Sequence, residues 1–461
     1  MNQITEDKIK LFSNKLNENK INIIKRNALS NNKLADIVKN RDVSQKRDSI
    51  FYKHIDVKVK NTNQKSSGRC WIFALLNLVR LDMIKKYDLE DNFEFSQNYL
   101  FFWDKLEKSN FFIQNIIKTK KHKIDSRLIQ FILEEPVSDG GQWNMLVNLV
   151  NKYGIIPKTS MNETFSSSNT SELNFMLNNK LRSIAYEIRE TNTNKKIDDY
   201  LEEIYKLLVL FLGEPPSKIV WKYYSIKQKQ KQYNITNDVT PKDFYRIYVP
   251  YNINDMVCLV NAPCESKPFY NLLNLRFFGN VVDGQSSRFI NIPIDEMIKI
   301  AKKSIDNNKA IWFGSDVDKY AEYKEGFLDT DYFNYNSIIE DKIKMNKGTR
   351  LNYSSSRITH AMIIKGYDKI NHKITKWLIE NSWGEHNELN GDLIMSNNWF
   401  KEYVMEIVVD KKFVPKKILD VYKRKPIILE PWDPLGLLLD KSNKTKKYKK
   451  KNKNTKKKIV Q

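Results

Sequence analysis

Apolar residues recur at helical spacing through the first half of the chain. Residues 4–24 place isoleucines, leucines and a phenylalanine among charged residues, which predicts one or two amphipathic helices. An apolar run over 70–84 predicts another helix, and Ser96 is suited to cap a further helix over the aromatic residues that follow it. The spacing over 143–150 and 171–211 is also helical.

The pattern changes from helix to strand beyond Pro241. Short apolar runs separated by Gly, Asn and Asp occur there at 245–249, 257–260, 310–313, 361–367, 375–380, 393–395 and 403–409. A short run at 55–59 alternates in the same way. Several such runs in succession predict an antiparallel sheet or a partly closed barrel. No internal repeat of solenoid length interrupts them.

Length and composition limit the class of protein. A chain of 461 residues with 41% hydrophobic residues suggests two or three structural units around a large core. The first residues lack the apolar core of a signal peptide, and the longest aliphatic stretch, 207–212, is too short to span a bilayer. The three cysteines, Cys70, Cys258 and Cys264, form no disulfide framework, so we expect a reducing, cytoplasmic location and no membrane partner.

The positive charge is unevenly distributed. Of the formal net charge of +23, the last 22 residues carry +10, from eleven lysines and one aspartate. The segment 440–461 is of low complexity and is predicted to be disordered. The charge of the remaining body is interpreted as ordinary solvated surface. Nucleic-acid binding through the Lys-rich tail remains an alternative hypothesis, because clustered lysines make non-specific phosphate contacts.

The stretch from Gln64 to Cys70 is the strongest candidate for chemistry. A polar turn with one glycine delivers Cys70 to the start of the helix predicted over 70–84. At a helix N-terminus, unpaired N–H groups and the helix dipole favour thiolate over thiol. Gln64 offers an amide N–H that can face a developing oxyanion. From this stretch alone, a nucleophile and a buried structural cysteine are both open interpretations.

Two later positions favour the nucleophile. His360 at the start of a predicted strand can serve as the base, and Asn381 at the end of another can orient its ring. Trp383 can shield the bond between them from water, and Gln64 with the Cys70 N–H would form an oxyanion hole. The other four histidines, His54, His122, His372 and His386, are expected at the surface or in packing roles. No HExxH pair or other metal set occurs, so no metal or cofactor is expected.

These residues together resemble a known family. The matching stretches are 63–71, 96–105, 139–143, 258–261, 310–314, His360, 381–384, 399–400 and 432–436. In this order they are similar to the papain-like cysteine peptidases, and among them to the bleomycin hydrolases and bacterial aminopeptidases C. The resemblance covers about residues 1–439.

The resemblance implies a two-lobed α+β fold, with a helical lobe, a lobe built on an antiparallel sheet or barrel, and helical insertions. The implied units are an N-terminal arm with an entry strand (1–60), a helical lobe with Cys70 (61–150), an inserted helical unit (151–240), a β-rich lobe with His360 and Asn381 (241–415), a C-terminal arm toward the active site (416–439) and the tail (440–461). The implied activity is that of a thiol aminopeptidase on short unfolded peptides, working through a thioester, in a homohexamer. Gly140 and Gly141 would then let a substrate backbone lie close, with Trp383 and Leu439 also lining the substrate site.

Two features of the sequence agree with the intracellular branch. Secreted papain relatives usually carry a cysteine three positions before the nucleophile for a disulfide, and Ser67 occupies that position here. Cys70 and His360 are 290 residues apart, where papain-type spacing is about 130–150 residues. Roughly one additional domain of chain is therefore inserted between them.

One feature departs from the family pattern. Family members end close to the position of Leu439, where the terminal carboxylate would receive the amino terminus of the substrate, but this chain continues for 22 residues. Three outcomes are open: trimming near Leu439, a substitute carboxylate from Asp440, or relaxed exopeptidase restriction. Endopeptidase or transferase activity, and a nucleic-acid-binding scaffold with this fold, are therefore the alternative functions.

Overall fold

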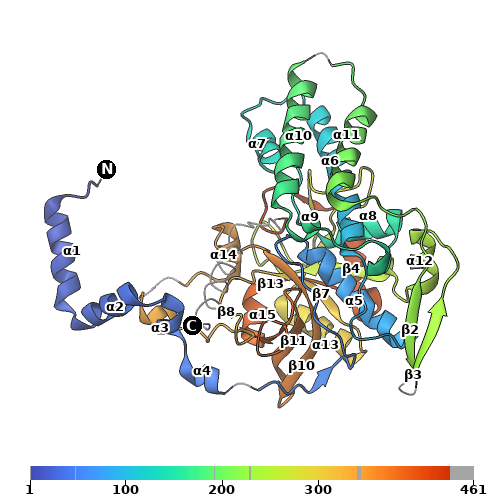
Figure 1. Ribbon diagram of the computed structural model, residues 1–461. Coiled ribbons are helices and arrows are strands. Elements are labelled where there is room, and N and C mark those ends of the chain that lie inside the picture. The colour runs from blue at the N-terminus through green and yellow to red at the C-terminus, as the bar shows by residue number, and fades with distance from the viewer. Residues whose placement is uncertain (1, 47, 192, 228–229, 340–343, 437–461) are drawn as a thin grey trace, which may run out of the picture.

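The computed structural model describes the whole chain except residues 1, 47, 192, 228–229, 340–343 and 437–461. Figure 1 shows a group of helices above a twisted sheet, with the N-terminal helices extending away from the body. Among the described residues, no helix is both long enough and apolar enough to cross a membrane.

The helices lie mainly in the first half of the chain, as the apolar spacing predicted. Their bounds are α1 Glu6–Glu18, α2 Lys20–Asn31, α3 Leu34–Val38, α4 Arg41–Gln45, α5 Cys70–Tyr87, α6 Gln97–Lys118, α7 Arg127–Glu134, α8 Trp143–Tyr153, α9 Phe165–Ser168, α10 Ser171–Glu190, α11 Ile197–Leu212, α12 Pro241–Tyr248, α13 Ile294–Asp306, α14 Lys347–Asn352, α15 Asn397–Tyr403 and α16 Lys416–Leu419. Ser96 caps α6 by accepting the Tyr99 N–H, which confirms the predicted cap.

The strands are β1 Lys53–His54, β2 Lys222–Lys227, β3 Gln230–Ile235, β4 Met256–Val260, β5 Leu272–Leu275, β6 Phe289–Asn291, β7 Ile311–Ser315, β8 Ala321–Glu322, β9 Phe327–Leu328, β10 His360–Ile370, β11 Lys373–Glu380, β12 Asp392–Ser396, β13 Val404–Asp410 and β14 Ile427–Leu429. The main sheet of the described chain runs β14-β5-β6-β4-β13-β7-β10-β11-β12-β9-β8, with β1 beside β10. Its centre is antiparallel, but β4–β6, β5–β14 and β9–β12 are parallel pairs.

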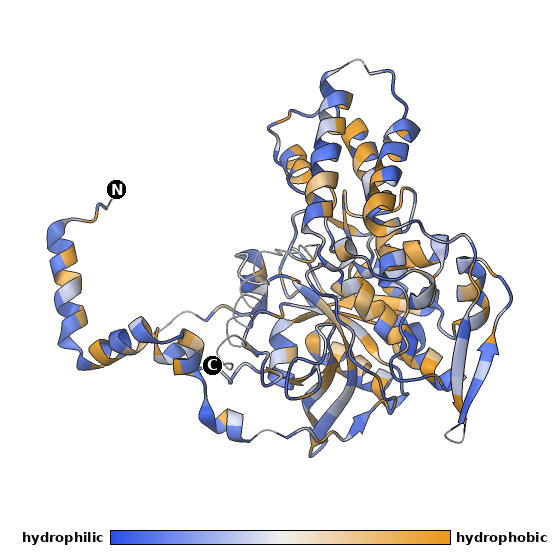
Figure 2. Cartoon of the chain, viewed as in Figure 1, coloured by the Kyte–Doolittle hydropathy of each residue, from blue (hydrophilic) through white to orange (hydrophobic). Residues whose placement is uncertain are grey.

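The helix that begins at Cys70 lies in the middle of the molecule. Helix α5 is buried over most of its length because it is apolar all round, which is expected of a helix covered on every side. It packs against β7 and β10 of the sheet and against α6 and α8 (Figures 1 and 2). The sheet and the helical layer therefore meet at α5.

The segment 151–240 is not helical throughout. Helices α10 and α11 pack on α6, and their buried leucines and isoleucines belong to the same apolar core as α5. The hairpin β2–β3 follows them. The prediction of a helical unit at 151–240 is therefore corrected, because this unit also contains two strands. The division into units remains a prediction.

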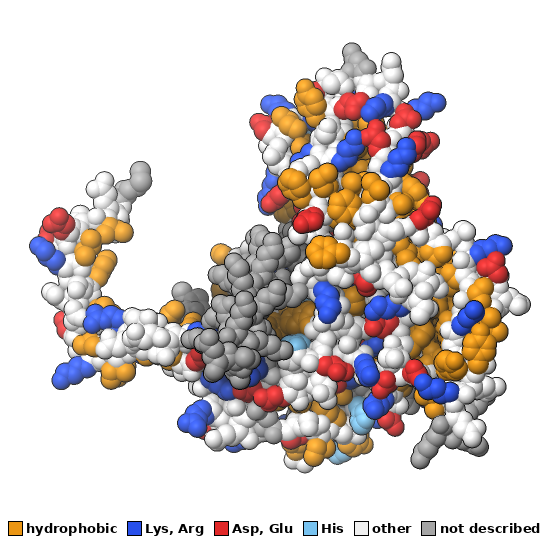
Figure 3. Space-filling view, in the orientation of Figure 1, with side chains coloured by type: hydrophobic (Ala, Val, Ile, Leu, Met, Phe, Trp, Pro, Cys, Tyr) orange, Lys and Arg blue, Asp and Glu red, His pale blue; other side chains and the backbone are white. Residues whose placement is uncertain are grey.

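The N-terminal arm has a different character from the body. Helices α1 and α2 bury none of their residues, and the apolar side chains of Ile9, Phe12, Leu16 and Ile24 are exposed. Figure 3 shows these helices as an extension with apolar side chains along it. Within one chain, the apolar sides of α1 and α2 are uncovered.

Two predicted strands are wrong. Residues 245–249 lie largely in α12, because Thr240 accepts the Asp243 N–H and Pro241 starts the first turn, both of which favour a helix. Residues 55–59 form no strand, because the strand that pairs with β10 ends at His54. The other predicted strands coincide with β4, β7, β10, β11, β12 and β13.

Candidate active site

Cys70 is the first residue of α5 and is buried, with 5% of its surface exposed. The N–H groups of Ile72 and Phe73 both reach back to the Arg69 carbonyl at 3.0 Å, which closes the first turn. The Cys70 N–H belongs to the first turn of α5, where backbone donors point out of the start of the helix. The structure thus places the thiol at a helix N-terminus, the location expected from the sequence.

His360 and Asn381 are hydrogen-bonded, with 2.8 Å between His360 Nε2 and Asn381 Oδ1. The same Oδ1 accepts the Ser382 N–H at 2.8 Å, which fixes the orientation of the amide. Because an amide oxygen only accepts, the proton of the neutral imidazole lies on Nε2. Nδ1 is then the basic nitrogen of His360.

Trp383 covers this pair. The ring centroids of His360 and Trp383 are 4.9 Å apart, and Tyr323 packs edge-on against the indole at 4.9 Å. His360 and Asn381 are almost fully buried. Burial lowers the pKa of His360 to about 4, with the Asn381 bond opposing that shift, so the imidazole by itself is neutral at pH 7.

Gln64 connects the cysteine turn to the Asn381 segment. Its side-chain Oε1 accepts the Ser382 hydroxyl at 2.7 Å, and its backbone N–H donates to the Ser382 carbonyl at 2.8 Å. Its amide nitrogen donates one N–H to the Ser67 carbonyl at 2.6 Å and carries a second N–H. The structure thus brings Gln64, His360 and Asn381 together, next to the turn that presents Cys70.

Gly141 is required by the packing of the cysteine helix. A Cβ atom at Gly141 would lie 2.7 Å from the Trp71 ring, well inside contact distance. The Trp71 indole N–H donates to the Asp139 carbonyl at 2.7 Å, which draws the segment 139–141 against α5. The predicted glycine pair Gly140–Gly141 therefore lies beside the residue that follows Cys70.

The family model that matches this chain is the peptidase C1-like family, over residues 3–436. The chain belongs to this family. It is a cysteine-type peptidase, as the resemblance implied, and its α+β papain-like fold agrees with a solved relative. That relative, PepW from Lactobacillus rhamnosis, superposes with a TM-score of 0.90 at 38% identity, over 94% of this chain and 99% of its own.

Curated relatives match over similar lengths. Aminopeptidase C of Listeria monocytogenes is 38% identical over 95% of this chain and 99% of its own length. Bleomycin hydrolase of Gallus gallus is 41% identical over 87% of this chain and 91% of its own, and that of Homo sapiens is 38% identical over 95% and 99%.

The peptidase also has buried charges around the cysteine turn that sequence reasoning missed. Lys105 and Asp139 pair at 2.8 Å, and Arg69 pairs with Glu163 at 2.8 Å. Arg69 and Lys105 are fully buried, and Asp139 almost so. Charged residues are rarely buried unless paired. A lysine within the predicted apolar helix after Ser96 was therefore the available signal of a buried ion pair.

The C-terminal arm of the peptidase runs back to the glycine segment. Gln142 Nε2 donates to the Leu435 carbonyl at 3.0 Å, and a buried ion pair of 2.9 Å joins Asp433 to Lys267. The last described residue, Gly436, is therefore near the segment 140–142. The predicted substrate contact at Leu439 and the Lys-rich tail lie outside the described residues.

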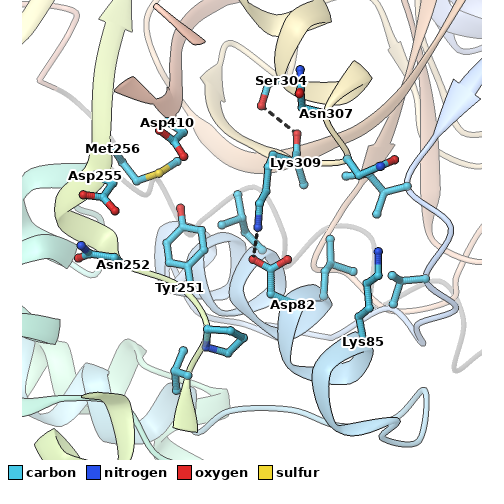
Figure 4. A pocket seen from close by; sticks show the side chains of 18 of the residues that line it. Asp82, Lys85, Tyr251, Asn252, Asp255, Met256, Ser304, Asn307, Lys309 and Asp410 are labelled. Carbon is cyan, nitrogen blue, oxygen red and sulfur yellow. Dashed lines mark hydrogen bonds and ion pairs between the residues drawn. The ribbon is translucent and has the colours of Figure 1, made fainter. Parts of the chain in front are cut away.

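A cavity of about 810 Å³ lies elsewhere, beside the second half of α5 (Figure 4). Asp82 and Lys309 form a 2.7 Å ion pair in its wall, and Tyr251 projects into it. Neither Cys70 nor His360 lines it. This cavity and the Cys70–His360 region are thus on different parts of the molecule.

His386 and His54, which the sequence places at the surface or in packing roles, are outside the His360–Asn381 pair. His386 lies at its edge, with its ring 6.1 Å from Trp383 and its Nδ1 2.9 Å from the Gly384 carbonyl. His54 is exposed on β1. Among the described side chains, no group of three or more His, Cys, Asp or Glu residues is placed to hold a metal ion.

Proposed function

We propose that this peptidase is a thiol aminopeptidase that removes residues from the amino termini of short, unfolded peptides. The observation that carries the proposal is the bonded pair His360–Asn381, tied through Ser382 and Gln64 to the turn that presents Cys70. This arrangement supplies a nucleophile, a base, a group that orients the base and an oxyanion donor.

The proposed reaction proceeds in two steps through a thioester. His360 Nδ1 takes the proton of the Cys70 thiol as Sγ attacks the peptide carbonyl carbon, and it then passes that proton to the leaving amine as the C–N bond breaks. A water molecule next attacks the thioester and gives a proton to His360. As the C–S bond breaks, that proton returns to Cys70 Sγ and the carboxylic acid is released. The Cys70 N–H and the second N–H of Gln64 stabilise the oxyanion in both steps.

The neighbouring residues have supporting roles in this proposal. Asn381 fixes the tautomer and the plane of the His360 ring, and Trp383 keeps water from their hydrogen bond. Gly140 and Gly141 leave space for an extended substrate backbone. Leu439, at the family's usual end, would lie near the amino terminus of the substrate.

The restriction to free amino termini has two supports. The compared relatives carry the names aminopeptidase C and bleomycin hydrolase. In this chain the described C-terminal arm is bonded to Gln142, directly after the glycine pair. If the tail is trimmed near Leu439, a chain end held there would block one side of the cleft, so the substrate would enter with its amino terminus first.

We also propose a cytoplasmic location and a homohexamer. Within the described chain no disulfide joins Cys70, Cys258 and Cys264, which suits a reducing compartment. The apolar residues of α1 and α2 are exposed in one chain and would be covered by contact with other copies.

A second activity, non-specific nucleic-acid binding, is favoured by one observation: the net charge of +10 on residues 440–461. Such binding would weaken steeply with salt and would be lost on removal of the tail, while peptidase activity remained. If the tail stays attached and keeps the terminal carboxylate out of the cleft, endopeptidase or transferase activity would appear.

The test of the main proposal is hydrolysis of aminoacyl fluorogenic substrates, with free and with blocked amino groups. The wild type is expected to cleave only the free-amine set, and Cys70→Ala is expected to cleave neither. Cleavage of blocked substrates would support the endopeptidase alternative. Cleavage by Cys70→Ala would remove Cys70 from the mechanism.

A further inference from the structure

The turn before Cys70 is bonded to a buried carboxylate that the reaction scheme does not use. Asp139 Oδ2 accepts the Gly68 N–H at 3.0 Å and the Thr170 hydroxyl at 2.5 Å. Asp139 Oδ1 accepts the Asn174 amide at 2.9 Å and pairs with Lys105 at 2.8 Å. Each oxygen of this carboxylate thus has two partners, which lie in the cysteine turn or in the segments around it.

The site is built for an ionised group. Burial alone would raise the pKa of the Asp139 carboxyl, but Lys105, Thr170 and the Gly68 N–H together hold it well below its usual range. A second lysine of the same helix, Lys108, donates to the Gly140 carbonyl at 2.5 Å. Two lysines of α6 thus bind the segment around Asp139.

The backbone of Asp139 holds the other side of the nucleophile. Its carbonyl accepts the Trp71 indole N–H at 2.7 Å, which Gly141 permits by leaving room for the ring. One residue therefore binds position 68 through its side chain and position 71 through its main chain. Cys70 lies between the two attachment points.

We propose that Asp139 is a positioning residue for the reaction, which holds the Gly68–Trp71 turn so that the Cys70 thiol and its N–H face the same carbonyl group. The inference rests on the proposed role of Cys70. Displacing a reacting group by about 1 Å can cost about 100-fold in rate. The two N–H groups proposed to bind the oxyanion must therefore be held to within about 1 Å of their positions.

The neighbouring residue Ser67 supports this assignment. Its hydroxyl donates to the Gln64 carbonyl at 2.6 Å and accepts from Arg69 Nε at 3.0 Å. This is the position where secreted papain relatives usually have a disulfide cysteine. Here, hydrogen bonds and buried charges hold the turn in place of that covalent link. A buried charge pair adds little to stability compared with apolar packing, so placement of the turn is the better explanation.

The test compares Asp139→Asn and Asp139→Ala with Glu107→Gln. Glu107 is a matched control because it is a buried carboxylate on α6, paired with Lys152, on neither the cysteine turn nor the 138–142 segment. For each variant we would measure kcat and KM on a free-amine substrate, the rate of Cys70 alkylation by iodoacetamide against pH, and the thermal midpoint.

Asp139→Ala is expected to lower kcat about 100-fold and Asp139→Asn about 10-fold, with KM little changed, because placement in the transition state is lost. The pH profile of Cys70 alkylation should shift in both, and Glu107→Gln should leave kcat and the profile unchanged. A wild-type kcat and profile in folded Asp139→Asn would overturn the proposal.

Folding and mechanism are kept separate by two further variants. If neither Asp139 variant folds, Thr170→Val removes one bond to the carboxylate and should lower kcat in the same direction; an unchanged kcat there would count against the proposal. If Cys70→Ala remains active, the proposed function fails. If Cys70→Ala is inactive while Asp139→Asn equals the wild type, only the positioning role fails.

Discussion

The two sides of the proposed active site are held by different kinds of structure. Cys70 follows a turn whose position depends on side-chain bonds from Asp139, Arg69 and Gln64. His360 instead begins β10, where it pairs with Ser315 in the centre of the main sheet. The nucleophile side therefore depends on a few polar contacts, whereas the base side depends on the register of the sheet. Substitutions on the two sides should fail in different ways.

The largest expected effect is the loss of the proposed base. His360→Ala should lower kcat/KM by about 10⁴-fold, since the thiol loses its proton acceptor. The sheet should remain folded, because the register of β10 is set by the backbone. The matched control is His54→Ala, an exposed histidine on the adjoining strand β1, which should keep wild-type kcat/KM. Equal losses in both variants would show that the strand, and not the imidazole, is responsible.

The next effect in size is on stability. Loss of a buried ion pair should cost more free energy of unfolding on the base side than on the nucleophile side. Glu380, just before Asn381, is fully buried and pairs with Arg80 at 2.7 Å. Breaking such a pair by Glu380→Ala should cost about 3–5 kcal/mol in the free energy of unfolding. Glu163→Ala should cost less, because Glu163 is 19% exposed and its attraction to Arg69 is already partly screened by water, whereas Arg80 and Glu380 are almost fully buried. Urea unfolding of both variants measures the difference, and a greater cost for Glu163→Ala would contradict the comparison.

The smallest expected effect links the two sides. In Cys70→Ala, no thiolate faces His360, so its pKa should be about 4, as burial dictates. In the wild type, a thiolate nearby would favour the imidazolium and raise that pKa. Titration of ¹³C-labelled histidines by NMR follows both proteins, with His360→Ala assigning the signal. The same pKa in both would mean that the thiol and the imidazole are not electrostatically coupled.

The sequence predicts the base side of the site well. His360, Asn381 and Trp383 fall at strand ends with strong local patterns, and the structure brings the three together. The wrong strand at 245–249 shows where local patterns compete: the helix-starting pair Thr240–Pro241 was present in the sequence, but the aromatic and aliphatic residues after it also suit a strand.

The polar support of the nucleophile could not be predicted in the same way. Asp139 precedes a glycine pair, and in the sequence it reads as a turn residue. Its partners Lys105 and Thr170 come from segments more than 30 residues away on either side, and only the folded chain shows that they share one carboxylate. Long-range pairing of buried charges leaves no periodic pattern in the sequence, whereas helices and strands leave a regular spacing of apolar residues.

The exposed arm has a consequence for how the protein responds to dilution. Helices α1 and α2 contain 13 and 12 residues and bury none of them. Isolated helices shorter than about 12–15 residues are marginal in water. If the proposed homohexamer forms, their helical content should follow mass action, rising as other copies cover their apolar residues. The bond between His360 and Asn381 lies within one chain and has no such dependence. Concentration would therefore control the arm's structure without changing the chemistry of an individual active site.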